Sequence, residues 1–455
     1  MASFTIKETI LSPTTADGII RWCVDEPFGN TTVDDLDIEK KGLRVSGWLL
    51  AEKNKPFQMV IIQNNSIIPL ETNVERPDVI EKVLQKSSSG HEDVLCGFNS
   101  FVKLSSPYFQ VGVIQQGRYQ ALVEYRVEGA LKVIEGDRNW LFLDNDSNNS
   151  VEQYTGRLKL TRKERTYWKE YFQELVQYKE SLGIHICMLI APSKEMVYSE
   201  YYPHKRAKVT PIDQLEKLAP ESFDLIIPIQ ELRNSDKRSY RVCDTHWSHY
   251  GAMCASIAVL SRQNKNIQAI EKLFSSDIYR TRHVTGDLGN KVFPPQKHDE
   301  EFLGSFNHQH FIVFDNQLPN FGRIRIIYYD DAMYDEVLLI LGSSSSYTMF
   351  NYLSRVYKTV VFVHCAGNVD PSFIKRIKPD FIVSQSNARF IVRPPSARED
   401  YTSFVREKAM LQQNKKIAPT VIKSDVVKES CHKNLKRIVG HISKLNNDGI
   451  ASIPF

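Results

Sequence analysis

Four consecutive serines stand where an apolar run changes into a helical pattern, in the segment LLILGSSSSYTMF (338–350). A serine on a turn from strand to helix projects its hydroxyl at the carboxyl edge of a sheet, near helix N–H groups that can hold an oxyanion. This is where the nucleophile of an acyl-transfer reaction would lie. A phosphate-binding loop or a simple helix cap would explain the same residues.

An acid-base pair precedes the serines, in the segment RVCDTHWSHYGAM (241–253). Asp244 and His246 are two positions apart, and in an extended segment such side chains share a face, so the carboxylate can orient the imidazole and stabilise its cation. A serine hydroxyl needs such a base to become a nucleophile. Two alternatives stay open: Asp244 or Ser248 caps the following helix, or His246 and His249 are metal ligands or surface residues.

The central part of the chain predicts the sheet that must position these groups. Residues 161–183 have the capping-box spacing of Thr161 and Glu164, an apolar helical face and a closing Gly183. The strand-like runs after it are IHICMLIAP, DLIIPI, EVLLILG, KTVVFVH and DFIVSQ, and the helical ones are YGAMCASIAVL, YTMFNYLSRVY and PSFIKRI. Their alternation predicts an α/β domain with a mainly parallel sheet and helices on both faces, which binds ligands at the carboxyl ends of its strands.

The N-terminal part has a different pattern. From about residue 40 to 135, β-branched and aromatic residues recur between Gly, Asn, Pro and Ser, which predicts an all-β sandwich. We therefore expect a β-sandwich domain at 1–135, the α/β domain at 136–397 and a basic helical tail at 398–455.

The expected tail is the basic part of the chain. Residues 401–455 contain ten Lys and Arg against four Asp and Glu, and apolar residues including Val427, Cys431 and Leu445 recur at helical spacing. This apolar face either packs on its own protein or a second subunit, which would make a homo-oligomer, or it touches an anionic membrane surface.

The bulk composition excludes several classes of protein. The net charge is only +4 over 455 residues, which argues against a nucleic-acid-binding protein that works by phosphate neutralisation. The seven cysteines are scattered without a Cys-x-x-Cys pair, so neither a disulfide framework nor a zinc site is indicated. The sequence shows neither a secretory signal nor the roughly 18 consecutive apolar residues of a membrane span, so we expect a cytoplasmic protein.

Six ordered landmarks resemble the AlgX/AlgJ-type alginate O-acetyltransferase family, whose members are SGNH-hydrolase-like enzymes. They are GDRNWLFLDND (136–146), APSKEMVYSEYYP (191–203), DTHWSHYGA (244–252), GDLGN (286–290), LGSSSSYTM (341–349) and KPDFIVSQSNARF (378–390). The resemblance spans roughly residues 136–395. It implies an SGNH-like, that is flavodoxin-like, fold for this region and an enzyme that transfers acetyl groups.

By position, the resemblance places the catalytic aspartate, histidine and serine of the family on Asp244, His246 and Ser344. Two departures affect the serine. The run of four serines leaves the nucleophile ambiguous by one position, and Ser343 replaces the Thr or Asp that is usual before it.

Further site residues follow from the same resemblance or from the ends of the expected strands. The oxyanion glycine and asparagine of the SGNH family fall on Gly322 and Asn316, with Asn320 as a competitor, although turn chemistry explains these residues equally well. The candidates for holding a sugar or an acyl donor are His364, Tyr347, Lys194, Tyr198 and Arg389.

The N-terminal region resembles a small β-domain attached to bacterial polysaccharide glycosyltransferases and related transferases. The motifs VSGWLL, ERPDV and CGFNSFV carry this similarity. A plain turn also explains Arg76, Pro77 and Asp78, and we expect Trp48 and Phe98 in the core and not on a sugar-stacking surface. The similarity favours a bacterial surface polysaccharide, such as a capsule, as the substrate.

These expectations together describe an O-acetyltransferase without a bound cofactor or metal. His246 takes the proton of Ser344, Asp244 holds the imidazole, and the serine attacks an acetyl donor, for which acetyl-CoA is the expected choice in the cytoplasm. A sugar hydroxyl then resolves the acyl-serine. An esterase with the same residues and a non-catalytic glycan-binding assembly protein are the alternatives.

Overall fold

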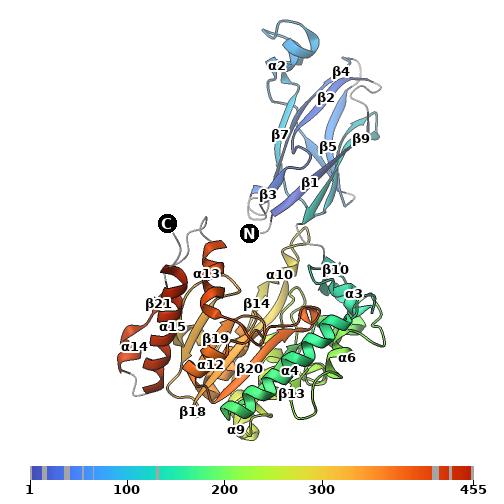
Figure 1. Ribbon diagram of the computed structural model, residues 1–455. Helices are drawn as coiled ribbons and strands as arrows, with labels where there is room; N and C mark the ends of the chain where they lie inside the picture. Colours follow the sequence, from blue (N-terminus) through green and yellow to red (C-terminus); the bar gives the residue numbers. More distant parts are fainter. Residues whose placement is uncertain are drawn as a thin grey trace. The chain divides into compact units, whose positions relative to one another are not determined.

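The computed structural model describes residues 3–12, 18–34, 41–53, 56–64, 66–129, 133–411, 420–429 and 433–451. The chain divides into two compact units, Met1–Val133 with Thr285–Lys297 and Ile134–Val284 with His298–Phe455 (Figure 1). The expected boundary after residue 135 lies near the observed one after Val133. The landmark GDLGN (286–290) groups with the first unit, and the expected tail groups with the second.

The first unit is a β-sandwich. Its six-stranded sheet has the order β3-β1-β9-β8-β5-β6, and its three-stranded sheet has the order β2-β4-β7. All of these pairs are antiparallel. The strands are β1 (Ser3–Ile10), β2 (Ile19–Glu26), β3 (Thr32–Asp34), β4 (Leu43–Ala51), β5 (Phe57–Gln63), β6 (Ser66–Leu70), β7 (Gly97–Val102), β8 (Tyr108–Gln115) and β9 (Arg118–Gly129).

Side chains from both sheets share the core of this unit. Trp48 and Phe98 are buried, which confirms that they are core residues. The inserted segment 285–297 contributes Phe293, whose ring packs edge-on against Phe4 with centroids 5.4 Å apart. Arg76 precedes the short helix α2 (Pro77–Val79), where it forms ion pairs with the carboxylates of two aspartates.

The second unit is built around an eight-stranded sheet with the order β13-β12-β20-β18-β19-β17-β16-β21. Its strands are β12 (His185–Ala191), β13 (Asp224–Ile226), β16 (Ile312–Asp315), β17 (Ile324–Tyr328), β18 (Tyr334–Gly342), β19 (Tyr357–His364), β20 (Phe381–Asn387) and β21 (Val421–Ile422). The five neighbouring strands β13, β12, β20, β18 and β19 are parallel to one another, as the apolar runs predicted. The pairs β19–β17, β17–β16 and β16–β21 are antiparallel, so the sheet is mixed.

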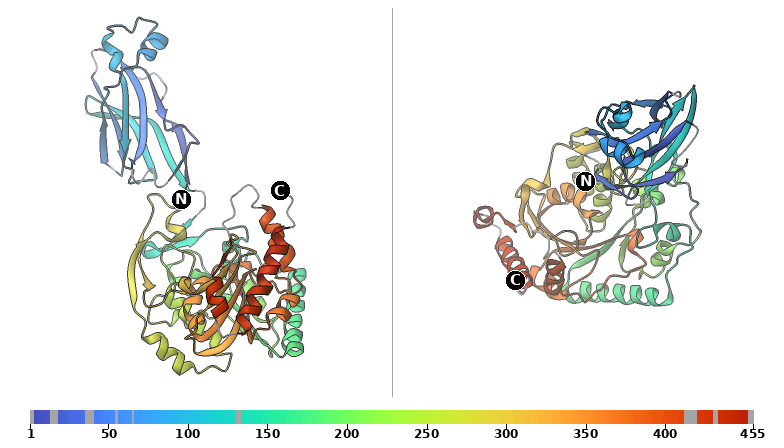
Figure 2. Two further views of the ribbon diagram at one scale, coloured as in Figure 1. Left: turned by 90° about the vertical axis from the view of Figure 1, so that its left-hand side faces the viewer. Right: turned by 90° about the horizontal axis from the view of Figure 1, so that it is seen from above.

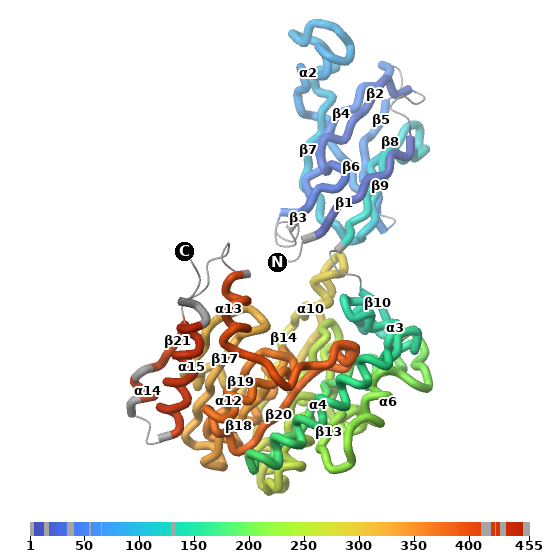
Figure 3. The backbone as a smooth tube through the Cα atoms, in the orientation of Figure 1, coloured from blue at the N-terminus to red at the C-terminus, as the bar shows by residue number. Residues whose placement is uncertain are grey.

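Helices cover both faces of this sheet. On one face, α4 (Arg162–Leu182), α12 (Pro371–Ile377), α13 (Tyr401–Leu411) and α15 (Lys433–Ala451) share a core with alternate strand residues (Figures 1 and 3). Because successive strand side chains point to opposite faces, the other strand residues meet α8 (His249–Leu260) and α11 (Ser346–Val356), which pack on each other and on the central strands.

Shorter elements connect these layers. The helices are α3 (Ser150–Tyr154), α5 (Lys194–Val197), α6 (Pro211–Glu216), α7 (Ile229–Arg233), α9 (Ile267–Ser275) and α14 (Ser424–Glu429). Helix α10 (Gly286–Gly289) lies in the inserted segment that belongs to the first unit. The two-stranded sheets pair β10 (Val133–Glu135) with β11 (Leu141–Leu143) and β14 (Tyr279–Val284) with β15 (His298–Leu303).

Helix α4 forms as its sequence predicted. The Thr161 hydroxyl accepts the Glu164 N–H at 3.2 Å, and the Glu164 carboxylate accepts the Thr161 N–H at 2.6 Å, which completes the capping box. Gly183 ends the helix with a φ of +64°, a conformation that glycine adopts without steric cost. Trp168 and Phe172 are buried against the sheet.

The basic C-terminal segment belongs to the core of the second unit. Leu435, Ile438 and Ile442 of α15 are 0 % exposed, and α15 lies beside α13 (Figure 2). Its apolar face therefore packs on its own protein, which is the first alternative that the sequence left open. Cys431 lies outside the described residues. None of the described helices has the length and apolar character that crossing a membrane requires.

We expect the substitution Ile438→Ala to lower the free energy of unfolding by about 2–5 kcal/mol, because it leaves a cavity where α15 meets the core. Ile422→Ala is the matched control at an exposed position of the same segment, where the change should stay within about 0.5 kcal/mol. Urea denaturation followed by tryptophan fluorescence measures both. Equal effects of the two variants would contradict the packing of α15.

Candidate active site

The serine cluster forms the turn between β18 and α11, and the neighbouring strand β20 anchors it. The side chain of Gln385 is buried, and its Oε1 accepts hydrogen bonds from the Ser343 N–H at 2.7 Å, the Ser343 hydroxyl at 2.9 Å and the Ser346 hydroxyl at 3.0 Å. Asn387 Oδ1 accepts the Ser345 hydroxyl at 2.9 Å. The hydroxyls of three of the four serines are therefore bonded to β20.

The hydroxyl of Ser344 meets the imidazole of His246 instead. Ser344 Oγ and His246 Nε2 are 3.0 Å apart. On the other side of the ring, His246 Nδ1 lies 2.8 Å from Asp244 Oδ1, which also accepts the His246 backbone N–H at 2.9 Å. A carboxylate at Nδ1 holds the proton there and leaves Nε2 to accept from the serine. This tertiary contact distinguishes Ser344 from the other three serines.

Asp244 is 5 % exposed. Burial alone would raise the pKa of its carboxyl, but the hydrogen bonds and charge of His246, together with the Arg241 guanidinium at 3.4 Å, hold that pKa well below its usual range. The ionised carboxylate stabilises the imidazolium that forms when His246 takes a proton. The arrangement can therefore remove a proton from Ser344 and later return it.

The structure corrects the expected oxyanion donors. Asn316 Nδ2 donates to Gly322 O at 2.9 Å, and Asn316 Oδ1 accepts the Ile324 N–H at 2.9 Å. The Gly322 N–H donates to His364 O at 3.0 Å. Asn320 and Gly322 have φ values of +56° and +87°, as a tight turn between β16 and β17 requires. The turn uses the Gly322 N–H and one Nδ2 proton of Asn316, whose side chain is 0 % exposed, so the observed bonds of both residues are those of a turn.

Asn387 is a donor that the sequence reasoning missed. Its Oδ1 accepts hydrogen bonds from Ser343 Oγ at 3.2 Å, Ser345 Oγ at 2.9 Å and Gln385 Nε2 at 3.0 Å, which places the amide beside the serine turn. Within the described parts of the chain, no acceptor bonds the Nδ2 of this amide. The signal was available, because Asn387 ends the strand next to β18 inside a family landmark.

The comparison with known families bears on this domain. Residues 133–314 match the family model of the SGNH hydrolase-like domain of the acetyltransferase AlgX. This match confirms the resemblance for that segment. It includes Asp244 and His246 and ends before Ser344, so the fold, and not the match, brings the serine to the acid-base pair.

Solved structures of three proteins resemble this chain at low identity. Bacillus cereus PatB1 shows 12 % identity and a TM-score of 0.45, over 60 % of this chain and 99 % of PatB1. The O-acetyltransferase domain of Pseudomonas putida AlgJ shows 14 % identity and a TM-score of 0.36, over 59 % of this chain and 94 % of the AlgJ chain. Pseudomonas aeruginosa AlgX shows 13 % identity and a TM-score of 0.32, over 59 % of this chain and 69 % of the AlgX chain. No curated protein matches the chain.

His364 and Tyr347 lie beside the serine turn and bond each other. The Tyr347 hydroxyl and His364 Nδ1 are hydrogen-bonded at 2.9 Å, and the Arg325 guanidinium lies 5.0 Å from the tyrosine ring centre. Burial and the nearby charges of Arg323, Lys408 and Arg325 lower the pKa of His364 to about 4. The ring is therefore neutral at pH 7. Contact of this pair with a ligand stays a prediction.

The structure corrects the roles expected for Lys194 and Tyr198. The ammonium of Lys194 is buried and donates to three backbone carbonyls within residues 241–244. The Tyr198 hydroxyl accepts the N–H of Ser239 at 2.9 Å. Both side chains therefore hold the acid-base segment. The Lys194 ammonium is too buried to grip a sugar, and contact of the half-buried Tyr198 with a sugar stays a prediction.

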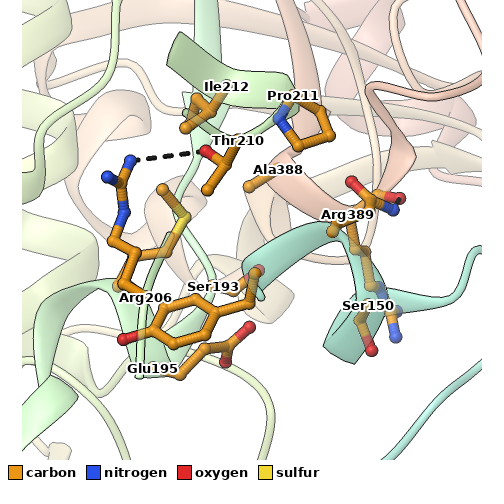
Figure 4. A pocket seen from close by; sticks show the side chains of 12 residues that line it. Ser150, Ser193, Glu195, Arg206, Thr210, Pro211, Ile212, Ala388 and Arg389 are labelled. Carbon is orange, nitrogen blue, oxygen red and sulfur yellow. Dashed lines mark hydrogen bonds between the residues drawn. The ribbon is translucent and has the colours of Figure 1, made fainter. Parts of the chain in front are cut away.

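Arg389 forms an ion pair with Asp146 at 3.3 Å and lines a small polar cavity. Figure 4 shows Arg389 on one side of this cavity and Arg206 on the other, with Ser193 and Glu195 between them. The cavity measures about 30 Å³, which accommodates about one or two water molecules. It is too small for a sugar, so binding of a sugar by Arg389 would have to occur outside it.

Buried histidines should make the stability of the second unit depend on pH. Burial is the largest of the causes that lower the pKa of His249 to about 3 and the pKa values of His308 and His364 to about 4. Unfolding raises each toward about 6.5, so the unfolded state binds protons that the folded state does not. The neutral rings therefore cost no stability above pH 6.5. As the pH falls from 6.5 toward 4, the free energy of unfolding decreases because the unfolded state takes up protons.

We expect His364→Asn to reduce the slope of the unfolding free energy against pH between 6.5 and 4.5 by up to about 1.4 kcal/mol per pH unit. Asparagine is chosen because its amide oxygen can still accept the Tyr347 hydroxyl. The control is His204→Asn at an exposed position, which should leave the slope unchanged. Urea titrations at several pH values provide the measurement, and an unchanged slope in the His364 variant would contradict burial of a neutral ring.

Proposed function

We propose that this chain is a polysaccharide O-acetyltransferase that carries the acetyl group on Ser344. The observation that supports this most directly is the hydrogen-bonded chain from Ser344 Oγ through His246 to Asp244. A second support is that the acid-base pair lies inside the segment that matches an SGNH-like acetyltransferase domain.

The first half-reaction acylates the serine. His246 Nε2 takes the proton of Ser344 Oγ as that oxygen attacks the acetyl carbonyl, and Asp244 stabilises the imidazolium. The negative charge on the carbonyl oxygen is held by Asn387 Nδ2 and the Ser344 backbone N–H. The C–S or C–O bond of the donor then breaks, and His246 protonates the leaving group.

The second half-reaction transfers the acetyl group. A sugar hydroxyl gives its proton to His246 Nε2 and attacks the acyl-serine, and the proton returns to Ser344 Oγ as the ester bond to the enzyme breaks. We propose a bacterial surface polysaccharide such as a capsule as the acceptor. Acetyl-CoA is the proposed donor, because a soluble thioester suits the cytoplasmic location that the sequence led us to expect.

The substitution Ser344→Ala should abolish acetyl transfer, with a loss of about 1,000-fold or more in kcat. The matched control is the adjacent Ser345→Ala, which removes a hydroxyl bonded to Asn387 and should retain most of the activity. Mass spectrometry of the protein and of acceptor oligosaccharides, after incubation with acetyl-CoA, detects the acyl-enzyme and the product. Acetate release without product acetylation would instead identify an esterase, and transfer by the Ser344 variant at the normal rate would refute the proposal.

We expect Asn387→Asp to lower kcat by about 100-fold to 1,000-fold with a smaller effect on KM, because it removes an oxyanion donor. Aspartate keeps an oxygen that accepts from Ser343 and Ser345, so the serine turn stays in place. The control is Asn316→Asp, at a residue whose side-chain amide bonds the turn between β16 and β17. A larger kcat loss in the Asn316 variant at temperatures where both proteins are folded would reverse the assignment.

A further inference from the structure

The acid-base segment has little regular structure of its own. Between the bridge partners Tyr240 and Trp247, the chain forms only turns and bends. Backbone N–H and C=O groups that are buried outside helices and sheets need partners elsewhere. The position of Asp244 therefore depends on side chains that bond the backbone around it.

Lys194 supplies most of these bonds from one side. It begins α5, directly after β12, and is 3 % exposed. Its Nζ donates to Arg241 O at 3.1 Å, Val242 O at 3.0 Å and Asp244 O at 2.8 Å. An ammonium has three protons to donate, so a single charged group satisfies three carbonyls of one loop, including that of Asp244 itself.

The landmark GDRNWLFLDND surrounds the ammonium. The ring centres of Trp140 and Phe142 lie 5.5 and 5.1 Å from Lys194 Nζ, at distances where a cation is attracted to the ring face. Between these two residues, Leu141 donates its N–H to Val242 O at 3.1 Å. The landmark thus stabilises the buried cation and bonds the same loop.

Glu300 and Tyr198 hold the segment at other points. Glu300 is 2 % exposed, and its carboxylate accepts the Val242 N–H at 2.8 Å and pairs with Arg238 at 2.6 Å. Tyr198 bonds the N–H of Ser239 at 2.9 Å. The loop that ends at Asp244 is therefore fixed by charged groups on both its N–H and its C=O sides.

We propose that Lys194 is a positioning residue for the Asp244–His246 pair, acting through the backbone carbonyls of residues 241–244 and not through contact with substrate. The ammonium is too buried to reach a polysaccharide, and its three bonds end at the residue that orients the base. The kinetic consequence rests on the proposed function; the positioning itself does not.

The test compares Lys194→Met with Lys265→Met. Methionine keeps the length of the side chain and removes the donors. Lys265 is a close match because its side chain is 5 % exposed and its Nζ lies 4.2, 5.2 and 4.4 Å from the ring centres of Tyr334, Tyr357 and Phe381. Those tyrosines and that phenylalanine begin β18, β19 and β20, so Lys265 lies at the opposite edge of the same sheet.

We expect Lys194→Met to lower kcat by about tenfold to a hundredfold with little change in KM. The acid limb of its pH–rate profile should move to lower pH, because a loosened carboxylate stabilises the imidazolium less. Lys265→Met should lose stability but keep the pH profile and kcat. A rise in KM alone for the Lys194 variant would indicate substrate binding, and equal changes in both variants would indicate general destabilisation; either result overturns the proposal.

A second measurement separates this proposal from the proposed function. In NMR spectra of protein labelled at histidine with ¹⁵N, the Nδ1 proton that His246 shares with Asp244 should resonate far downfield, and loss of the signal in His246→Gln assigns it. Lys194→Met should shift or abolish this signal, and Lys265→Met should preserve it. An unchanged signal refutes the positioning role even if acetyl transfer is confirmed, and a lost signal supports it even if no transfer is found.

Discussion

The hydrogen bond between Ser344 Oγ and His246 Nε2 joins two loops that no local pattern brings together. It forms only when the turn after β18 and the loop before α8 end at the same edge of one sheet. A change of about 1 Å in either loop would remove it, since a hydrogen bond of this kind weakens steeply with distance and angle. The chemistry of the site therefore depends on how firmly the two loops are held.

Each loop is held by its own buried polar group. Gln385 collects three donors of the serine turn on one oxygen, and Lys194 delivers three protons to the carbonyls around Asp244. A buried amide or ammonium group costs free energy when it is unpaired. Loop conformations that leave these hydrogen bonds unmade are therefore disfavoured. The fold uses these groups to select one geometry for the loops.

The same principle explains what several of the landmark segments do inside the protein. In GDRNWLFLDND, Trp140 and Phe142 flank the ammonium of Lys194, and Leu141 bonds Val242. Lys194 itself belongs to APSKEMVYSEYYP, in which Tyr198 bonds Ser239. Within KPDFIVSQSNARF, Gln385 anchors the serines and Asn387 offers a donor beside them. These segments lie at the carboxyl edge of the sheet. Residues at this edge include those that support the two loops as well as the candidate catalytic residues.

The sequence by itself determined the local structure and the types of residue that are candidates for catalysis. The capping box of Thr161 and Glu164, the apolar strands β12, β13, β18, β19 and β20 and the pair Asp244 and His246 could be predicted because they depend on neighbours in the chain. Tertiary structure decided which serine meets His246, that Asn316 and Gly322 close a turn, and that Lys194 is buried. These outcomes depend on partners far away in sequence, and a residue type alone does not reveal whether its hydrogen bonds are already used inside the protein.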